Sequence, residues 1–127
     1  MKGLALAAVV GVGLYLATRR GVSIQAQLLD GQGLPANRLL PSQIYTLRIE
    51  VGSHEDAVDL FTYAVEGGSS PFWFTPSYHS IRAGTPYVRE LTTPPTSSSG
   101  YLYAEVYRSN TDDRLGYIAT AYEVSSE

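Results

Sequence analysis

Residues 99–124, SGYLYAEVYRSNTDDRLGYIATAYEV, contain two alternating segments separated by one short polar turn. In the first segment apolar residues, from Leu102 to Val106, alternate with tyrosines or a glutamate. An alternation with a period of two places successive side chains on opposite faces of a β-strand. The stretch therefore predicts a β-hairpin with strands over about 101–108 and 115–124, joined by the turn SNTDD.

The preceding sequence predicts further short strands bounded by Gly, Pro, Ser and Asp clusters. The clearest alternation runs from Tyr45 to Val51, and no stretch between the strands has a helical period. Repeated short strands with turn signals between them are typical of an antiparallel fold built from two sheets. The five strands expected here cover about 22–28, 45–51, 57–66, 79–82 and 86–92.

In general plan these seven strands resemble the immunoglobulin-like and fibronectin-III-like β-sandwiches, and residues 99–124 look like the last two strands of such a domain. The resemblance implies that Tyr101 or Tyr103 serves as the corner tyrosine. The Cys–Trp–Cys framework of immunoglobulins is absent, and Trp73 lies outside the strand that carries their tryptophan. We expect an all-β, seven-stranded antiparallel immunoglobulin-like sandwich, with a jelly roll or an open barrel as alternatives.

An apolar segment, MKGLALAAVVGVGLYLATRR, precedes these strands over residues 1–20. A helix over its apolar run would rise about 24 Å, against roughly 30 Å for the hydrocarbon core of a bilayer. Snorkelling of Arg19 and Arg20 toward the headgroups would make up part of the difference. We therefore expect an N-terminal membrane-anchoring helix over 1–20 and a β-sandwich domain over 21–127.

Two alternatives to the anchor are a cleaved signal peptide and a helix buried in a protein assembly. A signal peptide ends after small residues at its cleavage site, and the sequence from Tyr15 to Arg20 fits that requirement poorly. Small residues spaced four apart let helices approach closely in lipid, although glycine and alanine are common in any membrane helix. The residues expected to pack in this way are Gly3, Ala7, Gly11, Gly13 and Ala17.

The composition excludes several partners and functions. A net charge of −3, with 17% charged residues, provides no basic surface for nucleic acid. The chain has no cysteine, which excludes disulfides and thiolate zinc sites. We expect no nucleic acid, no cofactor and no metal.

Few residues offer catalytic chemistry. His54 and His79 are the candidate bases, but no Gly-x-Ser-x-Gly turn accompanies them. The run Ser53–Asp56 could offer an imidazole and two carboxylates to a metal, yet adjacent residues of a turn rarely all point at one ion. Asp112 and its neighbours form no complete calcium loop. We expect a non-enzymatic protein without a small-molecule substrate.

The chain has ten tyrosines and three phenylalanines, and this composition indicates a function more clearly than the candidate catalytic residues do. If the apolar residues of the last two strands are buried, the tyrosines that alternate with them all face outward on the same side. Because tyrosine is enriched at protein contacts, these tyrosines predict a contact surface. High β-propensity of tyrosine is the alternative explanation. Three consecutive aromatic residues in PFWFTPSY cannot all face one core, so we expect Trp73 to be a contact anchor as well. The tyrosines expected at the contact are Tyr101, Tyr103, Tyr107 and Tyr117.

These features together predict a structural protein that binds neighbouring proteins. An anchor followed by a small sandwich resembles the minor membrane-anchored capsid proteins of tailless, membrane-containing bacterial viruses. That resemblance implies a virion location, with the lipid bilayer, other structural proteins of the assembly and further copies of this chain as partners. The alternatives are a cell-envelope adhesion or carbohydrate-binding module using Trp73 and Tyr78, a surface-filament subunit similar to archaeal pilins, and a membrane-bound hydrolase using His54 or His79.

Overall fold

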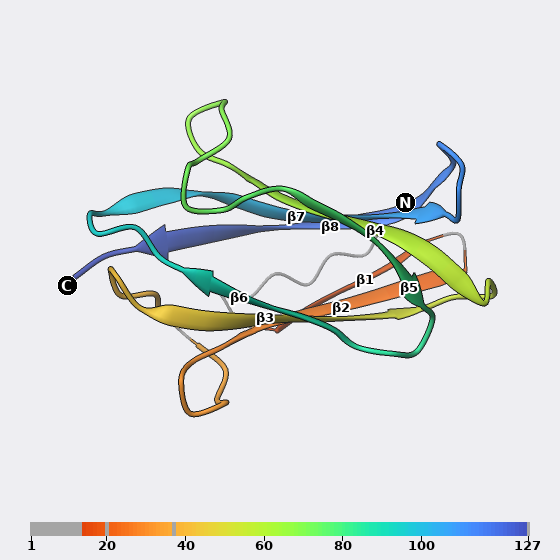
Figure 1. Cartoon of the computed structure of the whole chain (residues 1–127), viewed down its shortest axis with the longest axis horizontal. Coiled ribbons are helices and arrows are strands. Elements are labelled where there is room, and N and C mark those ends of the chain that lie inside the picture. The colour runs from red at the N-terminus through yellow and green to blue at the C-terminus, as the bar shows by residue number, and fades with distance from the viewer. Residues whose placement is uncertain (1–13, 20, 37, 127) are drawn as a thin grey trace.

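The computed structural model describes residues 14–19, 21–36 and 38–126, with residues 14–19 described by their backbone alone. Within these residues the chain is all-β, with eight strands and no helix (Figure 1). The strands are β1 (Leu14–Arg19), β2 (Val22–Leu29), β3 (Ile44–Gly52), β4 (Ala57–Val65), β5 (Ser77–Arg82), β6 (Tyr87–Thr92), β7 (Ser98–Arg108) and β8 (Arg114–Val124).

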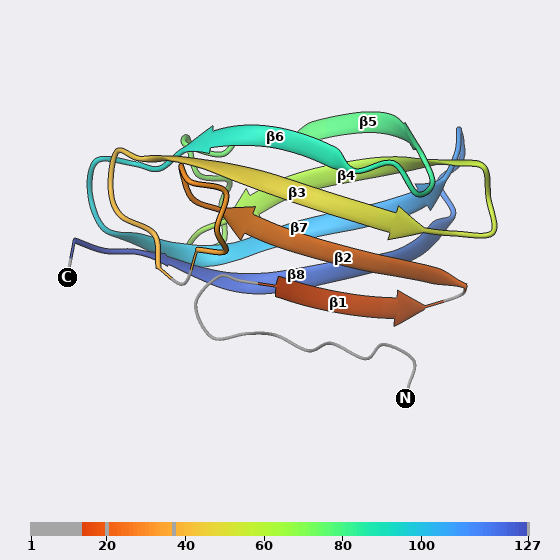
Figure 2. The same ribbon diagram turned by 90° about the horizontal axis from the view of Figure 1, so that it is seen from below.

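The described strands form two antiparallel sheets. One sheet has the order β1-β2-β3-β6, which Figure 2 shows edge to edge, and the other has the order β5-β4-β7-β8. The chain passes between the sheets after β3, after β5 and after β6. The all-β class and the strands expected from the alternation, β2 to β8, are therefore confirmed.

The alternation of each strand buries one face of each sheet. Along β2, buried residues alternate with exposed or half-buried ones, and β3 repeats this pattern. Buried side chains of both sheets belong to one hydrophobic cluster. Full burial of one such aliphatic side chain stabilises the fold by about 1.5–3 kcal/mol, so this shared cluster holds the two sheets together. Its fully buried members from the strands include Ile24, Ile49, Val51, Val58, Leu60, Val106 and Val124.

The segment between β4 and β5 adds aromatic side chains to this core. Phe74 is completely buried, and the guanidinium of Arg89 lies 4.5 Å from the centre of its ring. Trp73 packs edge-on against Phe74 and against Tyr122, with ring centres 5.6 Å and 5.2 Å apart. The segment between β4 and β5 therefore contributes Phe74 to the core and packs Trp73 against it.

The predicted hairpin of the last two strands is confirmed as β7 and β8. Asn110 adopts a left-handed conformation with φ of 61° in the turn, which asparagine tolerates better than most residues. The backbone N–H of Arg108 donates to the carbonyl of Asp113, and its side chain pairs with Asp113 and Glu55. The turn is therefore tied to the β3–β4 connection as well as to its own strands.

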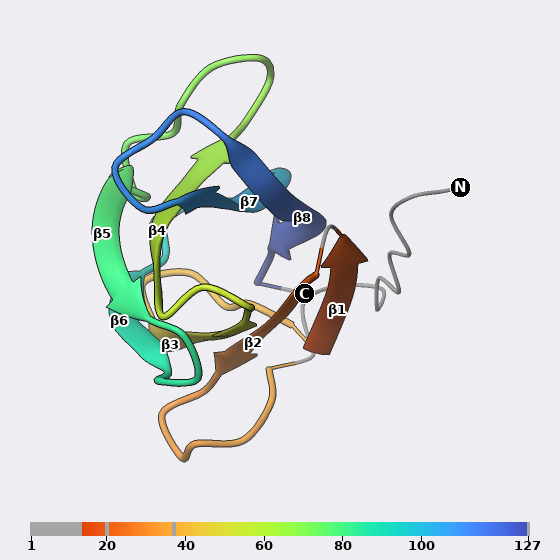
Figure 3. The same ribbon diagram turned by 90° about the vertical axis from the view of Figure 1, so that its right-hand side faces the viewer.

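A helix is expected from the sequence over residues 1–20, but residues 14–19 form a strand, β1. β1 pairs antiparallel to β2, with Ala17 opposite Ile24 and Arg19 opposite Val22. Without β1, the outer edge of β2 would have no backbone partner in this sheet. Gly21 has φ of +76° and permits the tight reversal between the two strands. β1 also lies beside β8 of the other sheet (Figure 3).

The rest of the predicted anchor lies outside the described residues. This includes the glycines and alanine expected to pack on another helix, Gly3, Ala7, Gly11 and Gly13, and also Arg20. A helix over residues 1–13 and a boundary between the anchor and the β-domain stay predictions.

Gly100 gives a test of the packing where β7 meets the end of β4. A Cβ at this position would collide with the carbonyl oxygen of Val65 and lie 3.0 Å from the ring of Tyr122. We expect Gly100→Ala to lower the free energy of unfolding by about 1–3 kcal/mol, because the backbone of β4 would have to shift. Urea unfolding followed by the fluorescence of the single tryptophan, Trp73, measures this loss.

Gly31→Ala is the matched control, since a Cβ there meets nothing within 4 Å. We expect its unfolding free energy to stay within about 0.5 kcal/mol of the parent protein. Equal stability of the two variants would show that β4 and β7 do not approach as closely at Gly100 as the structure has them.

Candidate functional site

The outer face of the β5-β4-β7-β8 sheet carries a set of aromatic side chains placed by the strand register. Phe61 on β4 lies between Tyr78 on β5 and Glu105 on β7, and Glu105 lies opposite Tyr117 on β8. Because inward residues such as Leu60 and Val106 alternate with these, the outward positions follow from the same pairing. We call this surface the aromatic face; its residues are Phe61, Tyr63, Tyr78, Tyr101, Tyr103, Tyr107 and Tyr117.

Adjacent rings of the aromatic face contact one another. Tyr63 and Tyr103, which are opposite each other on β4 and β7, stack with ring centres 4.9 Å apart and an interplanar angle of 6°. Phe61 lies 5.0 Å from Tyr63 and 6.1 Å from Tyr78, and Tyr101 lies 6.4 Å from Tyr103. Such contacts stabilise the rings by about 0.5–1.5 kcal/mol each beyond their buried area, so they limit how far the side chains can move.

Glu105 lies within the aromatic face and is only 9% exposed. Its carboxylate accepts hydrogen bonds from the hydroxyls of Tyr63, at 2.7 Å, and Tyr107, and lies 3.6 Å from the guanidinium of Arg114. Arg114 in turn stacks over the ring of Tyr117, 4.6 Å from its centre. One acidic side chain thereby holds residues of β4, β7 and β8 in fixed positions.

The same contacts change the acidity of the phenols. Burial, followed by the hydrogen bond and the charge of Glu105, raises the pKa of Tyr63 far above its usual value. The hydrogen bond to Glu105 is the main cause that raises the pKa of Tyr107, with burial second. Both phenols therefore stay protonated donors to Glu105, and neither is suited to act as a general base.

Asp59 is the second acid beneath the aromatic face and is 2% exposed. Its carboxylate accepts hydrogen bonds from the hydroxyl of Tyr78 at 2.9 Å, the hydroxyl of Ser80 at 2.7 Å and the backbone N–H of Asn110 at 2.9 Å. Burial alone would raise the pKa of Asp59, but these hydrogen bonds outweigh it and hold the pKa below its usual value. Asp59 thus ties β5 and the β7–β8 turn to β4.

The outer face of the other sheet differs in chemistry. Its described strands present hydroxyl, amide and charged side chains together with the exposed aliphatic residues Ile44 and Val88, and Arg48 pairs with Glu50 at 3.5 Å. The outward aromatic side chains of the described residues therefore gather on one of the two sheets. The outward residues of the polar sheet include Ser23, Gln25, Gln27, Thr46, Arg48, Glu50 and Glu90.

The structure places the four tyrosines expected at a contact, Tyr101, Tyr103, Tyr107 and Tyr117, together on the aromatic face. Their outward orientation is confirmed, while their role in binding stays a prediction. Sequence reasoning missed the β4 and β5 members of this face. Among the described residues neither the Tyr101 nor the Tyr103 hydroxyl makes the backbone hydrogen bond of a corner tyrosine, while the hydroxyl of buried Tyr45 accepts one from the backbone N–H of Leu40 at 2.8 Å.

Trp73 is half-buried, because its ring packs on Phe74 and Tyr122, and its indole nitrogen has no hydrogen-bond acceptor among the described residues. The residue of this segment that projects fully into solvent is Phe72. From the sequence Trp73 is expected to be the ring that contacts a neighbour, whereas the structure half-buries Trp73 and exposes Phe72; a binding role of Trp73 stays a prediction. Phe72 and Trp73 line a cleft of about 460 Å³ together with Glu66, Thr93, Pro94, Pro95, Thr96, Ser97 and Ser98.

The candidate catalytic residues do not form a site within the described part of the chain. The ring of His79 lies 5.1 Å from that of Tyr87, and His54 lies close to Gly21. Ser53 accepts a hydrogen bond from the backbone N–H of Glu55 at 3.0 Å, as expected for a simple polar turn. No group of three or more His, Asp or Glu side chains among the described residues has the arrangement of a metal site.

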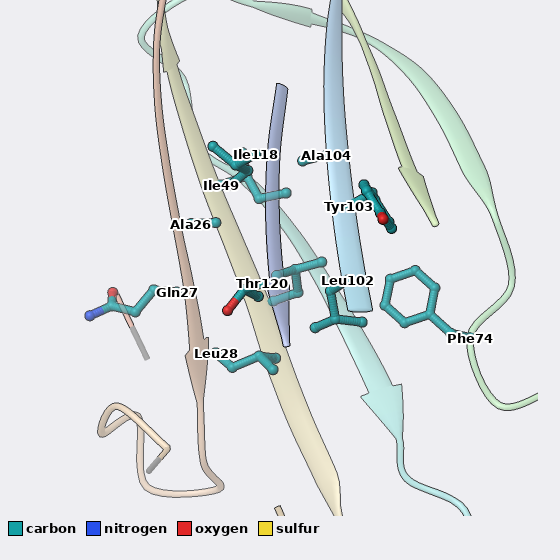
Figure 4. A pocket seen from close by; sticks show the side chains of 11 residues that line it. Ala26, Gln27, Leu28, Ile49, Phe74, Leu102, Tyr103, Ala104, Ile118 and Thr120 are labelled. Atoms are coloured by element: carbon teal, nitrogen blue, oxygen red, sulfur yellow. The ribbon is translucent and has the colours of Figure 1, made fainter. Parts of the chain in front are cut away.

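An apolar pocket lies between the two sheets where β2 and β8 face each other (Figure 4). Its volume is about 20 Å³. That is room for about one water molecule, so the pocket is a small packing gap and holds no organic ligand. Its lining includes Ala26, Leu28, Ile49, Leu102, Ala104 and Ile118.

Comparison of the chain with protein-family models and with curated proteins gives no match. In the described part of the chain, no helix has the length and apolar character needed to cross a membrane.

The hydrogen bonds of Asp59 predict how stability depends on pH. Because the pKa of Asp59 in the folded protein lies below the usual value of an aspartate, the ionised carboxylate stabilises the fold above that usual value, and this contribution is lost as the pH falls through the folded pKa. We expect Asp59→Asn to flatten the decrease in unfolding free energy between about pH 6 and about pH 2. Urea unfolding at a series of pH values measures both slopes.

Asp56→Asn is the control, because Asp56 is exposed in the β3–β4 connection, just before the strand that carries Asp59. Its pH dependence should match that of the parent protein. Parallel curves for Asp59→Asn and the parent would contradict the proposed hydrogen bonding of the Asp59 carboxylate.

Proposed function

We propose that this chain is a non-enzymatic structural protein, an immunoglobulin-like β-sandwich that binds neighbouring proteins through its aromatic face. The strand orders β1-β2-β3-β6 and β5-β4-β7-β8 support the sandwich, because the chain crosses between the sheets after β3, β5 and β6 as in Greek-key folds. The common hydrophobic cluster of the two sheets supports it as well.

The observation that carries the proposed binding role is the contrast between the two outer faces. One presents an Arg48–Glu50 ion pair, amides, hydroxyls and two exposed aliphatic residues, Ile44 and Val88, and the other presents seven aromatic side chains held by Glu105 and by ring contacts. Tyrosine offers a broad apolar ring, few torsions to freeze and a hydroxyl that tolerates water, so an ordered set of tyrosines suits recognition of a protein surface.

The proposed setting is an assembly in which an apolar layer holds the N-terminal segment, most specifically a virion with an internal membrane. Its support is the apolar sequence of residues 1–20 and the resemblance to membrane-anchored capsid proteins. Strand β1 takes six residues from the helix expected there, about 9 Å of its rise. This shortening favours burial in a protein layer over a full bilayer span, and a cell envelope is the alternative setting.

The binding role is tested on purified particles containing the protein. We expect the double variant Tyr101→Ser, Tyr103→Ser to be incorporated at least about tenfold less well, because central aromatic residues carry most of the energy of an interface. The amount of the protein per particle after density-gradient separation is the measurement. Gln25→Ser on the polar sheet is the matched control and should be incorporated normally.

Unchanged incorporation of a folded double variant would overturn the proposed role of the aromatic face. A photoreactive phenylalanine analogue at position 101 or 103 gives a second measurement, with cross-links to a neighbouring protein expected there and not at position 25.

A second candidate function, carbohydrate binding, is favoured by the cleft at Phe72. The fully exposed ring of Phe72 lies beside Glu66 and Ser98, which would supply a stacking surface and polar contacts for a sugar. Tyr78, expected at such a site, lines a different cavity. A glycan array tests this function: any binding should be lost in Phe72→Ala and kept in Leu34→Ala, whose side chain is exposed elsewhere. Absence of glycan binding by the parent protein would exclude it.

A further inference from the structure

One corner of the aromatic face contains a cavity between β4, β5, β7 and the β7–β8 turn. Its volume is about 260 Å³. This is slightly below the range of roughly 300–1,000 Å³ for sites of drug-sized ligands, and it suits a single side chain. Phe61, Tyr78, Tyr107, Thr111 and Asp112 line this cavity, which we call the aromatic cup.

The negative charge at the aromatic cup lacks a balancing cation among the described residues. Asp112 is exposed and makes no ion pair within the described part of the chain. The nearby arginines are committed to other groups: Arg108 pairs with Asp113 and Glu55, and Arg114 contacts Glu105 and the ring of Tyr117. The cup therefore combines three aromatic rings with one available carboxylate.

The two acids beneath the face hold the walls of the cup in place. The carboxylate of Asp59 accepts a hydrogen bond from the hydroxyl of Tyr78, and that of Glu105 accepts one from the hydroxyl of Tyr107. Asp59 also accepts a hydrogen bond from the backbone N–H of Asn110, and this bond fixes the turn that carries Thr111 and Asp112. A site whose walls are already ordered loses less entropy on binding, so this arrangement is suited to a ligand.

We propose that the aromatic cup binds the ammonium group of a lysine side chain from the protein partner. Aromatic rings attract a cation through their negative faces, and Asp112 supplies an opposite charge at the rim. Lysine fits because its charge is compact and its four-carbon stem is flexible and apolar enough to lie along the rings. This inference rests on the proposed function and names the partner chemistry at one part of the same face.

The test uses the folded protein and a defined probe, N-acetyl-lysine methylamide, with N-acetyl-norleucine methylamide as the neutral analogue of the same stem. Binding is followed by NMR chemical shifts of the residues of the cup. We expect the lysine probe to bind at the cup and the norleucine probe to bind several-fold more weakly.

Two variants remove the two proposed interactions separately. Asp112→Asn removes the charge and should weaken lysine binding by about threefold to fivefold. Phe61→Leu removes one ring without disturbing a hydrogen bond and should weaken it by about twofold to fivefold. Glu123→Gln, an exposed acid on the outer side of β8, is the control and should leave binding unchanged.

Equal binding of the two probes, or lysine binding that Asp112→Asn leaves unchanged, would overturn the proposal. Binding of choline at the cup without binding of the lysine probe would overturn the assignment of lysine as the occupant. The two proposals can fail separately. If Asp112→Asn is incorporated normally while the Tyr101→Ser, Tyr103→Ser variant is not, lysine binding by the aromatic cup is refuted and the proposed binding role of the aromatic face is retained.

Discussion

The antiparallel pairing of β4 with β7 is the constraint on which the rest of the structure depends. Its register places Leu60 opposite Val106 and Phe61 opposite Glu105, so that one pair faces the core and the other faces outward. A slip by one residue would reverse both faces, because side chains alternate along a strand. The tyrosines and Glu105 would then be buried and the aliphatic residues exposed. The hydrophobic core and the aromatic face are therefore two results of one pairing.

The two acids, Asp59 and Glu105, make the aromatic face more than a layer of apolar rings. Burying a carboxylate is costly unless hydrogen bonds and opposite charges satisfy it. Asp59 accepts three hydrogen bonds, and Glu105 accepts two and lies near Arg114. These contacts fix tyrosine hydroxyls from several strands at once. An ordered surface of this kind binds a partner with less loss of side-chain freedom than a set of independent tyrosines would.

The two sheets divide the work of the domain between them. The outer face of the β1-β2-β3-β6 sheet carries polar side chains and the exposed aliphatic residues Ile44 and Val88, and its edge strand β1 lies beside β8. The outer face of the β5-β4-β7-β8 sheet is aromatic.

The sequence by itself determined the strands β2 to β8 and the β7–β8 hairpin, because alternation with a period of two is a local property of the chain. The same alternation determined which side of the strands carries Tyr101, Tyr103, Tyr107 and Tyr117. The sequence did not determine the strand at Leu14–Arg19, where an apolar run fits a helix as well as a strand and the unpaired edge of β2 decided between them. Nor could it choose Phe72 over Trp73 as the exposed ring. The tertiary structure alone brought Phe61, Tyr63 and Tyr78 to the same surface and placed Asp59 and Glu105 among them, since hydrogen-bonded partners 19 to 51 residues apart meet only through the register between strands.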